Sequence, residues 1–347
     1  MRWPGRRSFL LAAGASAATA ATGRIRAAVL GTQHGHVVGK LQAMLDSADY
    51  DVAGVCEPNP EWRERRQGEA LFRGLKWMSE EELLGDPSIR LVVVECSVWD
   101  AIPLGTKVIA AGKHLHLEKP PGYRTAPFRE LVEEARRKNL LLQMGYIWRF
   151  HEGIAAAMEA ARKGWLGQVY MMRGTINTDL AAAAREKLER YKGGMMFELG
   201  CHQIDRAVDL WGRPKAVRAW LRHDTGFADK LADNTLAVLE YDQGLAVITC
   251  AGRMAGQAQH RSFELIGTEG TFQIQPVEPG TKMRVMMREA RGPYNAGWQD
   301  VALPPQPRYV GDMRDMARAL KNGQPLKYSY EYELLLQETL LRVCGEI

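Results

Sequence analysis

Three residues in the middle of the chain have the types and the spacing of an acid–base site. Residues 193–205 read GGMMFELGCHQID, which predicts a helix introduced by two glycines. On that helix Glu198 and His202 are four residues apart and Asp205 is three further on, so all three are expected on one face. Histidine titrates near neutral pH and a neighbouring carboxylate can orient its ring, so this face is a candidate general base or acid.

This polar stripe has two alternative interpretations. The spacing also fits an ordinary solvent-facing side of a helix. Glutamate and histidine four residues apart can bind zinc, but no further ligands cluster beside Glu198 and His202, so we predict no metal site.

A second candidate for acid–base chemistry is a lysine that follows an apolar run. Residues 114–121 read HLHLEKPP, which places Lys119 at the carboxyl end of a predicted strand, where a doubly wound sheet opens toward its ligand. A partly desolvated lysine there would have a lowered pKa and could exchange a proton with a substrate hydroxyl. A surface lysine at a strand end is the alternative.

The turn at residues 31–36, GTQHGH, aligns with the dinucleotide-binding fingerprint and keeps its first glycine in register. A predicted strand precedes it and a predicted helix follows, so the helix N-terminus can face a pyrophosphate. Glu57 ends the next strand, where a carboxylate accepts hydrogen bonds from ribose hydroxyls. A tight turn without a ligand is the alternative. The expected cofactor contacts are Gly31, Gln33, His34, Gly35, His36 and Glu57, with Cys96, Glu118 and Lys119 at the ends of later strands.

Glu57 also bears on the choice of dinucleotide. A carboxylate at that position repels a 2′-phosphate, so we predict NAD as the cofactor in preference to NADP. Arg63, Arg65 and Arg66 follow closely and keep NADP open, although the surface of a helix accounts for them more simply.

The elements that position these residues follow a βαβ rhythm in the first part of the chain. Predicted strands are Ile25–Gly31, Asp51–Glu57, Leu91–Cys96, His114–Glu118 and Leu140–Gly145. Helices are predicted between them, among them His36–Asp46, Ala101–Ala111 and Ala126–Lys138. Right-handed crossovers would stack these into a doubly wound parallel sheet, the Rossmann arrangement of an α/β protein.

After Tyr146 the pattern changes to an α+β type. Helices are predicted at Glu152–Lys163, Met195–Trp211, Val310–Lys321 and Tyr332–Val343. A strand is predicted at Val169–Ile176, and hairpins at Asn234–Tyr241 with Leu245–Ala251 and at Ser262–Ile266 with Thr271–Gln275. We expect a large, mainly antiparallel open sheet that helices cover on one face, leaving the other for a partner subunit.

Composition limits the class of protein. A length of 347 residues favours two domains, and 46% apolar with 25% charged residues is ordinary for a soluble globular protein. The net charge of +5 is small, and basic residues alternate with acidic ones, so nucleic acid is not an expected partner. The five cysteines are far apart and mostly within apolar runs, which favours burial over disulfides or zinc.

Residues 1–22 carry Arg6-Arg7 followed by an alanine-rich run, and they resemble a twin-arginine export signal. The run is too short and too weakly apolar to span a membrane, and Ala18-Thr19-Ala20 fits a small-residue cleavage site. We therefore expect an exported, periplasmic protein without a membrane anchor after cleavage. A disordered tail is the alternative.

Three ordered motifs resemble the glucose-fructose oxidoreductase, inositol dehydrogenase and rhizopine-catabolism family (Gfo/Idh/MocA). They are AGKH at 111–114 leading into EKP at 118–120, GYIWRF at 145–150, and the 193–205 segment with His202 and Asp205. The resemblance runs from about residue 24 to the C-terminus. It implies a dinucleotide-binding domain over residues 24–146 and a substrate-binding and oligomerisation domain over residues 147–347.

The resemblance also implies roles for individual residues. Lys119 and His202 would be the catalytic pair: His202 removes the hydroxyl proton of a sugar, polyol or glycoside, hydride passes to the nicotinamide, and Lys119 hydrogen-bonds the oxygen. Glu198 occupies a position where many members have aspartate, and the extra methylene displaces its carboxylate. Tyr146 and Arg149, together with Asp205 and His202, are the expected substrate contacts.

Some exported members of that family hold their cofactor tightly, and export makes the same behaviour an expectation here. Two other functions stay open: an NAD-dependent glycoside hydrolase or lyase that oxidises a ring hydroxyl transiently, and a non-catalytic sugar- or nucleotide-binding protein. A homodimer or homotetramer is expected from the open sheet.

Overall fold

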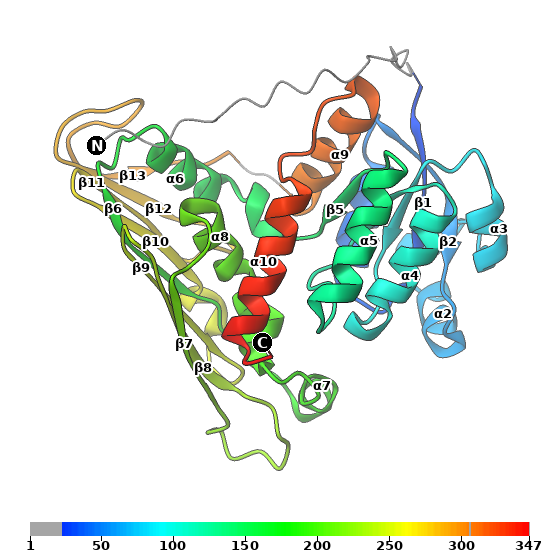
Figure 1. Cartoon of the computed structure of the whole chain (residues 1–347), viewed down its shortest axis with the longest axis horizontal. Coiled ribbons are helices and arrows are strands. Elements are labelled where there is room, and N and C mark those ends of the chain that lie inside the picture. Colours follow the sequence, from blue (N-terminus) through cyan, green and yellow to red (C-terminus); the bar gives the residue numbers. More distant parts are fainter. Residues whose placement is uncertain (1–22, 305–306, 347) are drawn as a thin grey trace.

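The computed structural model describes residues 23–304 and 307–346, which form two sheets with helices packed on them (Figure 1). The export signal predicted for residues 1–22 lies outside this part of the chain and stays a prediction. Within the described part, every helix is too short or too polar to traverse a lipid bilayer.

The first sheet has five parallel strands in the order β2-β1-β3-β4-β5. The strands are β1 (Ile25–Leu30), β2 (Tyr50–Cys56), β3 (Leu91–Val94), β4 (His114–Leu117) and β5 (Leu142–Met144). The intervening helices are α1 (Val37–Leu45), α2 (Pro60–Gln67), α3 (Glu80–Gly85), α4 (Val98–Ala110) and α5 (Thr125–Arg137). A short 3-10 turn, Ala70–Phe72, follows α2. The predicted doubly wound sheet is confirmed.

Helices cover both faces of this sheet, which explains why β3 is apolar throughout. On one face Val92 and Val94 pack in a cluster with residues of α4 and α5. On the other face Leu91 and Val93 pack with residues of α1 and of α9 (Val310–Asn322). Because α9 comes from the C-terminal part of the chain, a division at residue 146 separates the two sheets but not all of their helices.

The second sheet has eight strands in the order β13-β12-β11-β10-β6-β9-β8-β7, with β6 and β9 parallel and the other pairs antiparallel. The strands are β6 (Val169–Thr175), β7 (Ala216–Arg222), β8 (Asn234–Glu240), β9 (Leu245–Ala251), β10 (Ser262–Gly267), β11 (Gly270–Ile274), β12 (Met283–Met287) and β13 (Gly297–Val301). The helices α6 (Glu152–Arg162), α8 (Cys201–Trp211) and α10 (Tyr330–Val343) lie on one face (Figure 1). The predicted large, mainly antiparallel open sheet is confirmed.

The strands that the sequence did not predict are β7, β12 and β13, at or next to the two edges of this sheet. β7 and β13 are exposed or half-buried along most of their length, so they carry polar residues and lack a clear alternation of apolar side chains. The short polar helix α7 (Ala182–Leu188) was missed for the same reason. The five cysteines are buried and unpaired, as predicted.

Candidate active site

The predicted dinucleotide loop lies between β1 and α1 and is held in one conformation by hydrogen bonds. Gly31 has φ +82°, and a Cβ there would lie 3.1 Å from the Cβ of Cys96, so glycine lets the loop pack on the end of β3. The backbone N–H and hydroxyl of Thr32 donate to Glu57 Oε2 at 2.5 and 2.8 Å. Apart from Gly35 itself and its two chain neighbours, no heavy atom of the described residues lies within 4 Å of where a Cβ of Gly35 would be, so space is open beside the loop.

This loop fits a dinucleotide pyrophosphate on two observations. It leads directly into the N-terminus of α1, whose first turn carries no acidic residue that would occupy the positive end of the helix dipole. Glu57 stands at the end of β2, and its Oε1 accepts only the N–H of Asn59, at 2.8 Å, among the hydrogen bonds of the described residues. A carboxylate oxygen has room for further donors, so Glu57 can also accept a ribose hydroxyl.

The three arginines that kept NADP open are engaged elsewhere. Arg66 is buried and donates to the carbonyl oxygen of Thr32 at 3.0 and 2.9 Å, and it pairs with Glu69. The guanidinium groups of Arg63 and Arg65 lie over the rings of Trp77 and Trp62.

Below the loop lies a buried charge cluster that includes Glu118, one of the predicted cofactor contacts. The Lys40 ammonium donates to Glu95 Oε1 at 2.6 Å and to Glu118 Oε2. His36 Nδ1 lies 3.1 Å from Glu118 Oε1, and His34 Nδ1 lies 3.8 Å from Glu95 Oε2. The rings of His34 and His36 meet edge to face at 4.3 Å. The carboxylate of Glu118, which is paired with Lys40, therefore holds both loop histidines in place.

The protonation of this cluster follows from burial and from Lys40. Burial lowers the pKa of both His34 and His36, so the two imidazoles are neutral at pH 7. Burial raises the pKa of Glu95 to about 8. Burial alone would also raise the pKa of Glu118, but Lys40 and the two histidines hold it well below its ordinary value.

Sequence reasoning missed Lys40 and Glu95. Glu95 had a usable signal, because it ends the otherwise apolar run LVVVE, where a carboxylate needs a partner. His34, His36 and Glu118 bring possible metal-ligand atoms within 4.8 Å of one another. Both oxygens of Glu118 are already engaged by Lys40 and His36, so we assign these residues to the cofactor loop rather than to a metal centre.

Lys119 and Glu198, predicted from separate motifs, form an ion pair across the two domains. Lys119 Nζ donates to the carbonyl oxygen of Glu198 at 2.9 Å and to its Oε1 at 3.2 Å. The lysine is 2% exposed. Burial alone would lower the pKa of Lys119, but the negative charge of Glu198 raises it above its ordinary value. The sequence-based expectation of a lowered lysine pKa was therefore wrong, and Lys119 is a cation at neutral pH.

His202 does not contact either carboxylate that the helical spacing placed beside it. A π-helical turn, Met196–Gly200, precedes α8, so Glu198 is not stacked one regular turn from His202. Glu198 instead faces Lys119, and Asp205 pairs with Arg149 and Arg206. The expectation that these carboxylates orient His202 was therefore wrong.

Aromatic rings, not carboxylates, surround His202. The Trp148 ring lies 5.9 Å away, nearly parallel, and the Tyr146 ring lies 6.0 Å away, edge-on. His202 is 3% exposed, and its Nδ1 has no hydrogen-bond partner among the described residues. Burial lowers the pKa of His202 well below its ordinary value, and the charge of Lys119 adds to the effect. His202 is therefore a neutral imidazole that can accept a proton.

Arg149 and Asp205, two predicted substrate contacts, are joined to each other in a buried network. Arg149 donates to both oxygens of Glu333 on α10 at 2.5 and 2.7 Å and to Asp205 Oδ1 at 3.0 Å. Its guanidinium also lies 4.7 Å from the ring of Tyr146. These contacts occupy Arg149 and Asp205 fully, so their part in the site is to fix Tyr146 and α8 in place.

A cavity of about 830 Å³ opens beside Trp148. The residues that line it are Ile147, Trp148, Phe150, His151, Glu152, Ala258, Arg261, Glu278, Pro279, Gly280, Thr281, Leu303, Pro304, Pro307, Arg308, Tyr309 and Gly311. The Arg308 guanidinium pairs with both oxygens of Glu278, and Trp148 Nε1 donates to Glu278 Oε1 at 3.3 Å. Tyr309, another wall residue, lies 5.2 Å from the ring of His36. The cavity therefore borders both the His202 side and the cofactor loop.

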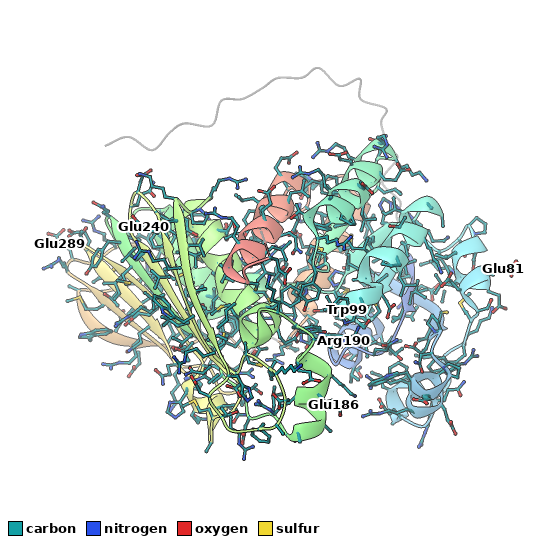
Figure 2. All side chains as sticks on the ribbon, turned by 60° about the horizontal axis from the view of Figure 1, so that its bottom comes forward. Glu81, Trp99, Glu186, Arg190, Glu240 and Glu289 are labelled. Atoms are coloured by element: carbon teal, nitrogen blue, oxygen red, sulfur yellow. The ribbon has the colours of Figure 1, made fainter. Side chains whose placement is uncertain are left out.

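The segment that contains α7 reaches from the second domain to the first. Lys187 lies over the Trp62 ring of α2 at 5.7 Å. Arg190 lies over the Trp99 ring of α4 at 4.7 Å (Figure 2). Arg185 anchors the segment to its own domain through Asp229 and Asp233. Because α2 and α4 start at the carboxyl ends of β2 and β3, this segment crosses the edge where Glu57 and Cys96 lie.

Comparison with known proteins agrees with both halves of the chain. Residues 25–146 match the family model described as an oxidoreductase family with an NAD-binding Rossmann fold. Residues 154–273 match the model of the GFO/IDH/MocA C-terminal domain.

Three individual relatives or solved structures that resemble this chain each share 30% sequence identity or less with it. An uncharacterized oxidoreductase of Schizosaccharomyces pombe is 30% identical over 240 residues, which are 66% of this chain and 63% of the relative, so the match spans less than two thirds of that protein. A myo-inositol 2-dehydrogenase of Thermotoga maritima is 24% identical over 87% of this chain and 88% of its own length. The structure of an aldose-aldose oxidoreductase from Caulobacter crescentus superposes with a TM-score of 0.78 at 19% identity, covering 93% of this chain and 98% of that one.

Proposed function

The chain belongs to the GFO/IDH/MocA family of NAD-binding oxidoreductases, and from this premise we propose that it transfers hydride between NAD and a hydroxyl-bearing carbon of a sugar, polyol or glycoside. One observation carries the proposal: the cationic Lys119, held by Glu198, acts electrostatically on the neutral His202, whose Nδ1 has no hydrogen-bond partner within residues 23–304 and 307–346. A proton acceptor and a fixed cation are what the oxidation of a hydroxyl needs from a protein.

The residues assigned to the dinucleotide are those of the loop at 31–36, the start of α1 and Glu57. The turn at residues 31–36 and the N-terminus of α1 would hold the pyrophosphate, and Glu57 the adenosine ribose. Arg66 already bonds to Thr32 and Glu69, and Glu57 can accept a further hydrogen bond from a ribose hydroxyl, so we favour NAD over NADP. When bound, the nicotinamide supplies the carbon that accepts the hydride.

The chain's own residues take up the proton and stabilise the developing charge, while the hydride is left to the nicotinamide. His202 accepts the hydroxyl proton on its imidazole while the C–H hydrogen leaves the same carbon with its electron pair, so a carbonyl forms. Lys119 donates a hydrogen bond to the oxygen and stabilises the negative charge that develops on it as the proton departs. Tyr146 and Trp148 keep bulk water away from His202, since both are 1% exposed.

The direct test is oxidation of cyclic sugars, polyols and glycosides with NAD⁺, followed by NADH absorbance. We expect at least one of these compounds to support turnover and NAD⁺ to be used in preference to NADP⁺. Absence of NADH formation across the whole panel, with protein that binds NADH, would reject the proposed activity.

Glu198 sets the upper pH limit of the reaction in this proposal. In the Glu198→Gln variant the negative charge that raises the pKa of Lys119 is gone, while the burial that lowers it remains. Lys119 would then lose its proton at lower pH, so the alkaline limb of kcat/KM should move down by about one pH unit or more. Profiles of kcat/KM against pH for the parent and the variant measure this shift.

Glu198→Asp is the matched control, because it keeps the charge and shortens the side chain. Its alkaline limb should stay closer to that of the parent than the limb of Glu198→Gln does. Identical alkaline limbs in all three proteins would show that Lys119 does not carry the cation on which the reaction depends.

We also propose that the outer face of the eight-stranded sheet joins two copies of the chain. Trp220 on β7 and Trp298 on β13 are 50% and 53% exposed, and Leu245 on β9 is 37% exposed. Exposed apolar side chains on an uncovered sheet mark an interaction surface. The double variant Trp220→Asp/Trp298→Asp should lower the mass measured by light scattering from that of an oligomer to that of a monomer.

The variant Trp99→Asp is the control for this experiment, since Trp99 is 43% exposed but lies on α4 of the first domain. It should leave the mass unchanged. A parent protein that is already monomeric at micromolar concentration would count against the interface.

A further inference from the structure

The cavity beside Trp148 lies beyond the reacting groups rather than around them. Every residue that lines it falls between 147 and 311, so the described residues of the first domain contribute none of its wall. Lys119 and His202 are not among the lining residues either. The 830 Å³ is therefore bounded by residues other than the two proposed reacting groups.

Trp148 connects the two regions. His202 lies on one side of Trp148, and its ring is nearly parallel to the indole, with the ring centroids 5.9 Å apart. Its Nε1 donates to Glu278 in the cavity wall. A substrate carbon beside His202 would thus place whatever is attached to it within reach of the Glu278 and Arg308 pair.

The size of the cavity suits more than one ring. A single hexose occupies roughly 200 Å³ at protein-like packing density, about a quarter of the space. Cavities of about 300–1,000 Å³ are typical of sites that enclose ligands of drug size. A free monosaccharide that reacts at His202 would leave this cavity filled only with water.

The charges of the wall balance, which argues for a neutral occupant. Two cations, Arg261 and Arg308, face two carboxylates, Glu278 and Glu152, and burial lowers the pKa of His151 so that it adds no charge at neutral pH. Apolar and ring side chains complete the wall: Trp148, Phe150, Tyr309, Leu303, Pro279, Pro304 and Pro307. Ion-paired arginine and glutamate beside such rings suit hydroxyl groups and flat ring faces.

We propose that the substrate is a neutral glycoside, whose reacting ring lies at His202 and whose second ring, a sugar or an aryl group, lies in the cavity beside Trp148. This inference rests on the proposed function and narrows it from any sugar or polyol to a compound with two linked rings. The glycosidic bond stays intact in the reaction.

The test compares substrates that share one reacting ring. For each of several hexoses and pentoses, the free sugar, the methyl glycoside, the phenyl glycoside and a disaccharide are assayed with NAD⁺. We expect kcat/KM for the phenyl glycoside or the disaccharide to exceed that for the methyl glycoside by about tenfold or more. The aryl and disaccharide series distinguish the two kinds of second ring.

A variant that fills the cavity isolates its contribution. Ala258 lines the cavity, so Ala258→Trp should abolish the kcat/KM advantage of the two-ring substrates over the methyl glycoside. Ala255 is exposed on the same loop and does not line the cavity, so Ala255→Trp is the control and should keep the advantage. If Ala258→Trp is unstable, Arg261→Met removes the hydrogen-bonding head of a wall residue and should reduce the same advantage.

Calorimetric binding of the phenyl glycoside to NADH-loaded protein separates this inference from the proposed function. Binding that Ala258→Trp abolishes, without oxidation of any compound, would uphold the cavity assignment and reject the oxidoreductase activity. Oxidation of free sugars and glycosides with equal kcat/KM would uphold the oxidoreductase activity and reject the cavity assignment. An advantage that persists in both cavity variants would also overturn the glycoside assignment.

Discussion

Replacing Lys119 with methionine should lower kcat/KM by roughly 10³-fold, or about 4 kcal/mol of transition-state stabilisation. Methionine keeps much of the length and volume of the side chain but removes the cation that stabilises the substrate oxygen. Lys119 is 2% exposed and its Nζ lies 2.9 Å from the carbonyl oxygen of Glu198. A cation from solvent therefore cannot readily take the place of the lost ammonium group. Steady-state kinetics with the best substrate of the panel measures the loss.

Lys113→Met is the matched control for this variant. Lys113 is also buried and donates to the carbonyl oxygens of Asp86 and Ile89, but it precedes β4, whereas Lys119 follows it. It should lower the thermal midpoint while kcat/KM of the folded protein stays near the parent value. If Lys119→Met retained turnover and the control did not, Lys119 would have no part in the chemistry, and a binding protein of the same fold would be the better description.

Replacing His202 with asparagine should lower kcat/KM by roughly 10²- to 10⁴-fold, the range of general acid–base contributions. The pH profile gives the sharper readout. Because burial lowers the pKa of His202 well below its ordinary value, the parent's kcat/KM should be level near pH 7 and fall only in acid, as the imidazole gains a proton. Asparagine does not titrate, so the residual activity of the variant should lack that acid limb.

His114→Asn controls for the loss of a partly buried imidazole. Burial lowers the pKa of His114 to about 4, but this residue begins β4, at the end of the strand opposite Lys119, and its Nδ1 accepts the N–H of Leu141. The variant should keep both the rate and the acid limb. An acid limb that survives in His202→Asn would assign the proton to another group.

The sequence predicted the βαβ part of the fold well because its strands are apolar and fully buried. β3 is the clearest case, since all four of its residues lie in the interior of a covered parallel sheet. The same property made Lys119 and the 31–36 loop predictable, because residues at the carboxyl ends of such strands meet at one edge of the sheet. Edge strands such as β13 gave no comparable signal, because half-exposed positions tolerate polar residues.

The side-chain partners were less predictable than the backbone. Helical spacing placed Glu198, His202 and Asp205 on one face, but their partners come from residues far away in the sequence. Glu198 meets Lys119 and Asp205 meets Arg149, and both pairings depend on how the two domains pack. Lys40 was missed because a buried lysine looks like a surface residue of an amphipathic helix until its two carboxylates are known.

The π-helical turn at Met196–Gly200 constrains which insertions and deletions this chain can tolerate. Loss of one residue there would let the helix return to regular winding, with a phase change of about 100° for everything on one side of the deletion. Either Glu198 would turn away from the first domain, or His202 and the Arg149 partner Asp205 would rotate together out of their positions. The extra residue of the π-helical turn thus keeps two parts of one helix, each anchored separately, in their present orientations. Substitution of a residue in this turn should be tolerated far better than its deletion.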